Sequence, residues 1–574
     1  MILLSKVISS LIKNPLLELI LTGLLFLSVA LMVTYPLVRN LAHSVLECGD
    51  TLQVAYVQAW NAQNLFVTIP TLFNAPIMHP LPLPLTYIEH MRGLMILFAP
   101  VYWLSGNPIL AFNLSLILGY TISGLGCFGF LRALLPKNAA GWCGACVAGG
   151  IFAYNPWRLI QFGHLEQVCA LWIGPLLLCL VLYLEQKRSR YLFGFVAFTV
   201  MQTLISYYYV LICGVLIVAG VAYVLLLKRT CLHTVGSALC TVSIIMLIVH
   251  LPLALPYIQN QSARLISPEE QHFFSLQTRQ DLLGSRQSAP LRRFLFGSAA
   301  IEVPTMERML DAGIISYTLA AISIVLACRS TPAYRRAVLV SVSTVATGLI
   351  LCMGPYLQIG ERQIPMPFGL LRLLPGIGSL RGPARLWQIS LVAIAILSGL
   401  AVWRLSARLK PKVAILLCIS SFLAIALFLR ASPVRSTAMV SVPPVCSWID
   451  KVLPDNAVLL HLPWVFEGRV ENRIFVWPDA EKMLCAIYHR RKMVNGFLAY
   501  VPPEQLIRQQ CIAGFPSPQA MDCVHKTGVT HILVNREDVS VDVSRQLDAP
   551  GEALRLGLVE LYRDATHILY RVNE

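Results

Sequence analysis

The 574-residue sequence has little charge. Only 13% of its residues are Asp, Glu, Lys or Arg, where soluble domains carry about 25%. By contrast, 56% are hydrophobic, and the mean hydropathy is +0.67. The sequence contains no zinc-ligand spacing, no Walker phosphate loop and no GxGxxG fingerprint. This composition excludes a soluble protein with a large core and predicts a polytopic membrane protein.

The net charge of +16 relates first to membrane topology and to anionic lipid headgroups, so membrane lipids are expected partners and nucleic acid is not. The first apolar run, 16–38, is too long for a cleavable signal, and no small-residue cleavage site follows it. We therefore interpret it as a retained first span.

Most of the sixteen cysteines lie in apolar segments, where a thiol behaves as a small hydrophobe. Four lie in the polar C-terminal part, namely Cys446, Cys485, Cys511 and Cys523. A disulfide such as Cys511–Cys523 is compatible with the sequence, but spacing alone does not establish the pairing.

Eleven apolar windows have roughly the length that a helix needs to cross the hydrocarbon layer. They are 16–38, 108–131, 139–155, 168–184, 191–206, 208–227, 234–256, 310–328, 337–354, 386–403 and 413–430. Residues 93–104 are too short to cross, so we expect an interfacial or re-entrant helix there.

Basic residues near the span ends set the orientation. With the N-terminus in the cytoplasm, five short basic loops all fall on the cytoplasmic side. They carry Arg132/Lys137, Lys187/Arg188/Arg190, Lys228/Arg229, Arg329/Arg335/Arg336 and Arg404/Arg408/Lys410/Lys412. Counting 93–104 as a span would place the next two of these loops outside, which supports its exclusion.

In this register every long polar connection lies on the outer side, including 39–107, 257–309 and 355–385. Residues 1–430 then form the transmembrane domain with these outer loops. Residues 431–574 differ in composition, with short strand-like runs at 458–464, 530–535 and 567–572. The sequence thus predicts an α-helical membrane protein with about eleven transmembrane helices and a small extracytoplasmic α/β or α+β domain.

The predicted spans are nearly free of ionisable groups; His250 and Gln202 are the main polar residues in them. An ion-coupled transporter needs a titrating group at mid-membrane depth. The clean spans therefore disfavour a transporter and move any chemistry to the outer face.

The outer segments supply a set of acids, histidines and arginines that could act on a lipid-linked substrate. The candidates are Asp50, Glu89, His90, His164, Glu166, Tyr207, Arg264, Arg381 and Arg385. Each has a simpler interpretation: Asp50 as a helix cap, His164 as an interfacial histidine, Tyr207 in an aromatic belt, and the arginines paired with acids or headgroups.

A first span followed by a long outer loop with an early acid resembles the GT-C superfamily of membrane glycosyltransferases. More narrowly, GDT…Q…W, FNAPIMHP, YIEHMRG, FAYNPWRLIQFGHLE, SYYY, LRLLPGIGSLRGPARLW and VNGFLAYVPP resemble a bacterial branch near the YfhO-like proteins. The resemblance covers most of the chain.

This resemblance implies inverting transfer from a polyprenyl-phosphate sugar to a cell-envelope glycan, lipid or protein at the outer face of a bacterial inner membrane. Asp50 would orient or deprotonate the acceptor. The arginines would hold the lipid phosphate, and Glu89, His90, His164, Glu166 and Tyr207 would shape the pocket.

The sequence departs from the family pattern in two respects, which bear on metal binding and on oligosaccharyltransferase activity. GDT offers a single acid rather than the paired acids of metal-binding members, so a divalent metal is not supported. The WWDYG signature of oligosaccharyltransferases is missing, and WVFEG at 464–468 is a superficial echo. The alternative is a non-catalytic protein that uses the same scaffold to handle or assemble lipid-linked glycans.

Overall fold

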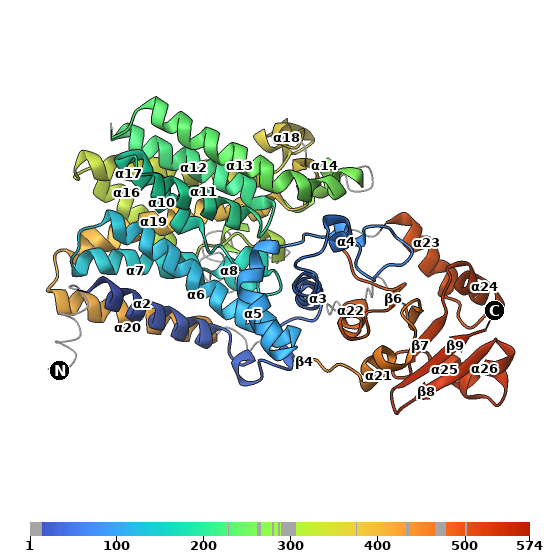
Figure 1. Cartoon of the computed structure of the whole chain (residues 1–574). Coiled ribbons are helices and arrows are strands. Elements are labelled where there is room, and N and C mark those ends of the chain that lie inside the picture. Colours follow the sequence, from blue (N-terminus) through green and yellow to red (C-terminus); the bar gives the residue numbers. More distant parts are fainter. Residues whose placement is uncertain are drawn as a thin grey trace.

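The computed structural model has two parts, a bundle of long helices and a smaller C-terminal domain at one end of it (Figure 1). It describes residues 14–227, 229–260, 266–277, 281–284, 288, 306–374, 376–431, 437–464, 478–499 and 502–573.

A helix lies in each of the eleven apolar windows. These helices are α2 (Pro15–Val33), α6 (Pro108–Leu134), α7 (Ala139–Tyr154), α10 (Ile173–Gln186), α11 (Ser189–Thr203), α12 (Tyr208–Leu226), α13 (Leu232–Gln259), α16 (Ile314–Ala327), α17 (Pro332–Cys352), α19 (Trp387–Ser406) and α20 (Pro411–Ala431). At the centre of the bundle, α7 packs against α19 and α6.

Seven helical segments in the described part of the chain are long and apolar enough to cross a membrane, which indicates a multi-pass membrane protein. They are Pro15–Val33, Pro108–Leu134, Leu165–Gln186, Tyr208–Leu226, Leu232–Gln259, Pro332–Cys352 and Pro383–Ser406. The predicted number of about eleven crossings stays a prediction, because α7 and α11 have only 16 and 15 residues and α16 has 14.

Several of these helices begin at a polar cap followed by proline. The Asn107 side chain accepts the N–H groups of Ile109 and Leu110, and proline follows at the first helical position. Asn14 caps α2 and Thr331 caps α17 in the same way. Such a cap satisfies N–H groups that the helix leaves free, and proline has no N–H to satisfy there.

Short elements at one end of the bundle, together with the connections between them, carry most of the candidate residues. They are η1 (Leu37–Arg39), α3 (Asp50–Gln63), α4 (Ile69–Phe73), η2 (Pro84–Tyr87), η3 (Arg92–Leu94), α5 (Met95–Ser105), α8 (Pro156–Ile160), α9 (Leu165–Val168), α14 (Pro268–Phe273), η5 (Asp281–Leu283), η6 (Met306–Arg308), the hairpin β2 (Tyr356–Ile359) and β3 (Arg362–Pro365), α18 (Pro367–Leu371), η7 (Ile377–Ser379) and η8 (Pro383–Leu386). The expected helix near 93–104 is α5, only 11 residues long.

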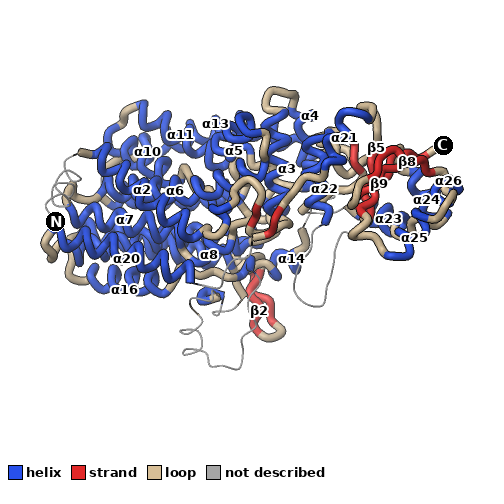
Figure 2. The backbone as a smooth tube through the Cα atoms, turned by 90° about the horizontal axis from the view of Figure 1, so that it is seen from below, coloured by secondary structure: helices blue, strands red, loops and turns tan. Residues whose placement is uncertain are grey.

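The C-terminal domain is built on a five-stranded sheet in the order β6-β5-β7-β9-β8 (Figure 2). The strands are β5 (Val458–Leu462), β6 (Lys492–Met493), β7 (His531–Asn535), β8 (Leu558–Arg563) and β9 (His567–Val572). β5 is parallel to β6 and β7, whereas β9 is antiparallel to β7 and β8. Three of the five strands are the ones that the sequence predicts.

Two cores cover this sheet. One contains residues of α23 (Pro503–Ile512) and α24 (Pro518–Lys526), and the other contains residues of α21 (Pro444–Val452) and α22 (Pro478–His489). The remaining helices are α25 (Val541–Asp548) and α26 (Glu552–Arg555). β5 is buried along its whole length because helices cover both faces, and all of its residues except His461 are apolar.

The domain is attached to the segment between α2 and α6. β1 (Ser44–Val45) pairs with β4 (Ala438–Met439), and α22 packs on α3. Residues 76–79 run beside β6: the Met493 N–H donates to the Pro76 carbonyl at 2.9 Å, and the His79 N–H donates to the Met493 carbonyl at 2.9 Å. The domain therefore holds the loop that carries Asp50.

Candidate active site

Asp50 is the first residue of α3, but its neighbour Glu47 caps that helix. The Glu47 carboxylate accepts the backbone N–H groups of Gly49, of Asp50 at 3.2 Å and of Thr51 at 3.1 Å. The Asp50 side chain is 42% exposed and makes no cap hydrogen bond at this helix start. The simple interpretation of Asp50 as the helix cap is therefore wrong, because Glu47 occupies that role.

The short connection after α8 brings His164 against the start of α3. Gly163 allows this approach, since a Cβ there would lie 3.0 Å from Glu47 Oε2 and 3.4 Å from the Asp50 Cβ. His164 Nε2 lies 3.5 Å from Asp50 Oδ2, and His164 Nδ1 lies 3.5 Å from Glu166 Oε1. His164 therefore bridges the two acids.

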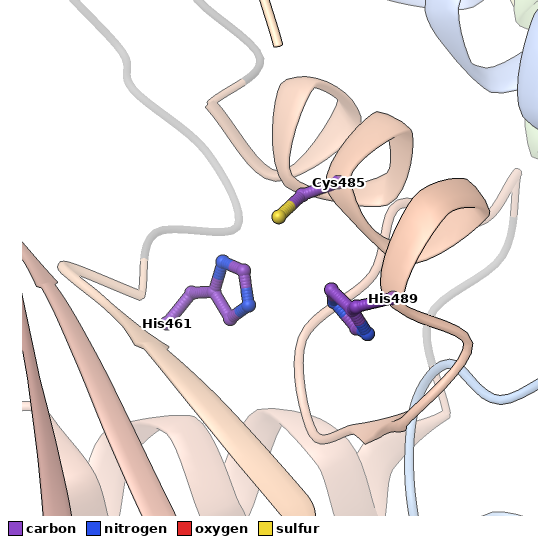
Figure 3. A group of neighbouring side chains, drawn as sticks. All are labelled: His461, Cys485 and His489. Carbon is purple, nitrogen blue, oxygen red and sulfur yellow. The ribbon is translucent and has the colours of Figure 1, made fainter. Parts of the chain in front are cut away.

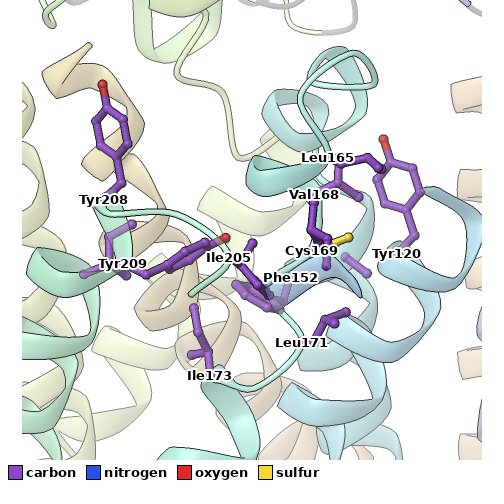
Figure 4. Close-up of a cluster of buried hydrophobic side chains, with 14 of the residues drawn as sticks. Tyr120, Phe152, Leu165, Val168, Cys169, Leu171, Ile173, Ile205, Tyr208 and Tyr209 are labelled. Carbon is purple, nitrogen blue, oxygen red and sulfur yellow. The ribbon is translucent and has the colours of Figure 1, made fainter. Parts of the chain in front are cut away.

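A buried scaffold fixes this connection. The fully buried Arg158 donates to the carbonyls of Gln167 and Val168 at 2.9 and 2.7 Å, and to Gln388 Oε1 of α19 at 3.2 Å. The Tyr209 hydroxyl donates to the Glu166 carbonyl at 2.9 Å. Apolar side chains that include Leu165, Val168 and Cys169 pack beneath (Figure 4).

Arg385, in η8, closes the cluster from the other side. Its guanidinium forms a two-pronged pair with Glu307, at 2.6 Å to Oε1 and 3.2 Å to Oε2, and lies 3.4 Å from Glu166 Oε1. Glu307 Oε1 in turn lies 3.8 Å from His164 Nε2. Four segments distant in the sequence thus meet at one small charged centre.

The electrostatics of the centre favour a charged His164 and an ionised Glu307. Burial disfavours the imidazolium, but the Asp50 carboxylate, helped by Glu166 and Glu307, outweighs burial and the Arg385 charge, so the pKa of His164 is raised. Burial opposes ionisation of Glu307 as well, yet Arg385 holds the pKa of that carboxyl at about 2. Burial, with the Asp50 charge, raises the pKa of Glu47.

Glu89 lies beside this centre. The Ser206 hydroxyl is 3.0 Å from each of its carboxylate oxygens. Burial, together with the Glu166 charge, raises the pKa of Glu89 to about 7, against the opposing influence of Arg385. Glu89 therefore exchanges a proton in the physiological range.

His90 and Tyr207 line a small pocket together with Glu89. His90 Nδ1 pairs with Asn61 Oδ1 at 3.1 Å, and burial lowers the pKa of His90 to about 3. The Tyr207 ring meets the Tyr257 ring edge-on, with the centroids 5.5 Å apart. His90 is thus a neutral, largely packed residue, whereas Glu89 links the pocket to the charged centre.

The other two arginines are placed differently. Arg381 is half-exposed, pairs with Glu270 at 3.0 Å and stacks over the Phe274 ring at 4.4 Å. Its charge helps to lower the pKa of Glu307, so it stands near the centre without joining it. Arg264 lies outside the described residues.

The centre fits a divalent cation poorly. Its most buried acids, Glu166 and Glu307, are paired with Arg385, so a guanidinium occupies the place that a metal would take. Within the described residues, the His/Cys/Asp/Glu group whose ligand atoms converge most closely is His461, Cys485 and His489, in the C-terminal domain. We therefore assign no metal-assisted step to the Asp50 centre.

Glu47 and Glu307 lie in the polar segments that supply the candidates, but neither is among the site residues predicted from the sequence. The position of Glu47, three residues before a helix start, indicates a capping role, because a carboxylate there can accept the free N–H groups of the first turn. Glu307 lies in the long connection between α13 and α16, and its pairing with Arg385 spans 78 residues. Periodicity and local spacing carry no information about such a contact.

The long apolar helices, the charged centre at one end of the bundle and the appended sheet domain together describe a multi-pass membrane protein. A solved structure with this architecture is the arabinofuranosyltransferase AftD from Mycobacteria, with TM-score 0.58 and 15% identity. The match covers 97% of this chain and 40% of AftD, so the chain spans less than half the length of AftD.

The oligosaccharyltransferase AglB from Archaeoglobus fulgidus is also similar, with TM-score 0.48, 10% identity and coverage of 97% of this chain and 74% of AglB. No family model and no curated protein matches the sequence. The likeness to AftD shows that the two chains share a fold; membership of the GT-C superfamily and of its YfhO-like branch stays a prediction.

Proposed function

We propose that this protein is a glycosyltransferase of the bacterial inner membrane. It transfers a sugar from a polyprenyl-phosphate carrier to a cell-envelope acceptor at the extracytoplasmic face. The observation that supports this most strongly is the meeting of Asp50, His164, Glu166, Glu307 and Arg385 at one centre. The five basic loops of the sequence support the outward orientation of that centre.

The proposed reaction is a single displacement. Asp50, the exposed acid of the centre, takes the proton from the acceptor hydroxyl as its oxygen attacks the anomeric carbon. The bond from that carbon to the phosphate oxygen breaks, and its electron pair leaves with the phosphate. The new bond forms on the opposite face of the sugar, so the configuration inverts.

Cations beside Asp50 stabilise the leaving phosphate in this proposal. His164 carries a raised pKa and faces Asp50 directly. Arg381 is half-exposed and free to turn toward a ligand from its exposed partner Glu270, a pairing of the kind that contributes little. Arg385 reaches the phosphate by exchanging its Glu307 partner, as a guanidinium fork binds either anion.

The rival proposal is a non-catalytic protein that binds lipid-linked glycans. The observation that favours it is the pairing of Arg385 with two carboxylates, which leaves less free positive charge for a phosphate. Dispersed candidate residues would have supported this rival further. Asp50, His164, Glu166 and Arg385 instead lie together, so we favour the enzyme.

The arginines give the first test. Binding of a polyprenyl monophosphate to the detergent-purified protein is measured for Arg381→Lys, Arg385→Lys and the double variant. Lysine keeps the charge but loses the fork, so we expect the double variant to bind roughly tenfold more weakly or worse.

Arg362→Lys, in the exposed strand β3, is the matched control and should bind as the unmodified protein does. Equal affinity of the double variant and the control would remove both arginines from the phosphate site. The single variant Arg381→Lys keeps the test interpretable if the double variant misfolds, because the Arg381 side chain is half-exposed and its replacement should leave the fold intact.

A further inference from the structure

A second cluster of reactive side chains lies in the C-terminal domain, away from the Asp50 centre. His461 comes from β5, and Cys485 and His489 come from α22 (Figure 3). One ligand atom from each of the three lies within 4.8 Å of the other two. Cys446 of α21 joins the cluster through its disulfide to Cys485.

The local structure explains why these residues meet. Side chains alternate along a strand, so His461 shares a face of β5 with Leu459, and Leu459 belongs to the core beneath α21 and α22. Cys485 and His489 are four residues apart in α22 and so lie on one face of that helix. All four side chains are buried.

The disulfide leaves these buried histidines unexplained. His461 Nε2 and His489 Nε2 have no hydrogen-bond partner within the described structure. Buried polar groups are nearly always partnered, because an unpartnered one forfeits its hydration.

We propose that Cys446, Cys485, His461 and His489 form a zinc site in the reduced protein, and that the disulfide is the oxidised form of the same site. Two cysteines and two histidines are a common donor set for structural Zn²⁺. This proposal does not depend on the glycosyltransferase function.

The chemistry of the interconversion balances with a dithiol as reductant. The dithiol gives two electrons and two protons to the Cys446–Cys485 bond, which becomes two thiols, while the dithiol closes to its own disulfide. Zn²⁺ then displaces the two thiol protons and binds both sulfurs as thiolates.

The two histidines are unequal ligands. His489 Nδ1 accepts the backbone N–H of Arg491 at 3.0 Å, so its Nε2 carries the ring proton. A half-turn of this ring breaks that hydrogen bond and presents an unprotonated nitrogen. His461 Nε2 has no hydrogen-bond partner within the described residues, so His461 can present an unprotonated nitrogen without breaking a hydrogen bond there. We therefore expect His461→Ala to lose more zinc than His489→Ala.

The test measures zinc in the full-length protein in detergent, after reduction, exposure to Zn²⁺ and removal of unbound metal. We expect one zinc per chain, lost in Cys446→Ser/Cys485→Ser. The matched control is Cys511→Ser/Cys523→Ser, which removes the other disulfide, and it should retain the zinc. No zinc in the reduced protein, or equal zinc after His461→Ala, would overturn the proposal.

A second measurement needs no substitution and so does not depend on how variants fold. The reduced protein is alkylated with and without a metal chelator, and each cysteine is quantified by peptide mass spectrometry. Zinc should protect Cys446 and Cys485 in a chelator-sensitive way and leave Cys511 and Cys523 unaffected. Protection that ignores the chelator would contradict a metal site.

Discussion

Among single residues, Glu47 and Asp50 lie three positions apart and have different roles: Glu47 caps α3, and Asp50 is the proposed base. Glu47 accepts the free N–H groups at the start of α3, whereas the Asp50 side chain points toward His164. A cap needs an acceptor, and a base needs a carboxylate that an incoming hydroxyl can reach. The 42% exposure of the Asp50 side chain meets the second need.

This division predicts that two alanine substitutions change the unfolding free energy by different amounts. Glu47→Ala should lower the unfolding free energy by about 0.5–2 kcal/mol, the usual cost of a lost helix cap. Asp50→Ala should change it by less than about 0.5 kcal/mol, as at most surface positions. The measurement is the melting temperature in detergent; an equal loss in both variants would return the capping role to Asp50.

Glu89 gives a pH-dependent prediction. Its pKa is about 7 in the folded protein against 4.5 ordinarily, so the folded state holds the proton more tightly than the unfolded state does. The stabilisation is therefore complete below pH 4.5 and is lost as the pH rises to about 7, by up to about 3 kcal/mol.

Glu89→Gln should remove this loss, because an amide does not titrate. Between pH 5 and pH 8 the melting temperature of the unmodified protein should fall more than that of the variant. Glu361→Gln, an exposed acid in the turn between β2 and β3, is the control and should behave as the unmodified protein. If the melting temperature depended on pH in the same way for all three proteins, a raised pKa at Glu89 would be contradicted.

At the level of elements, the site depends on the close approach of the α8–α9 connection to α3. Gly163 sits at the contact, where a methyl group would meet the Glu47 carboxylate at 3.0 Å. That carboxylate is already engaged with the first turn of α3. The connection therefore cannot shift without disturbing the helix that carries Asp50.

Gly163→Ala should lower the melting temperature, by a free energy of about 0.5–2 kcal/mol if the Glu47 cap is displaced. Gly129→Ala, within α6, is the matched control. A methyl group added there would have no atom within 4 Å, and alanine favours the helical conformation more than glycine does. A melting temperature for Gly163→Ala at or above that of the control would show that the contact is not tight.

The helices and strands also show which parts of the fold can be predicted from the sequence. Apolar length located all eleven bundle helices, and short strand-like runs located β5, β7 and β9. Strands β6 and β8 were missed: β6 has two residues, and β8 is partly exposed with an irregular register. Local pattern thus found the long elements, whereas the contact of Arg385 with Glu307 depends on tertiary folding.

Across the whole molecule, the C-terminal domain packs against the segment between α2 and α6, which carries α3. α22 packs on α3, and the Gln53 side chain donates to the Phe497 carbonyl at 2.8 Å. Asp50 therefore lies between the membrane helices and the sheet domain.

The central claim is transfer of a sugar from a polyprenyl-phosphate carrier with Asp50 as the base. The most direct test is mass spectrometry of envelope glycans and lipid-linked sugars in cells that lack the gene and are complemented with the natural or the Asp50→Asn gene. Loss of a general base typically costs roughly 100-fold in rate or more.

We therefore expect the deletion and Asp50→Asn strains to share one profile, in which a polyprenyl-phosphate sugar accumulates and an envelope glycan lacks that sugar. The natural gene should restore both. The protein level of the variant is measured alongside, to separate activity from folding. A natural profile in the Asp50→Asn strain, at equal protein level, would contradict the account.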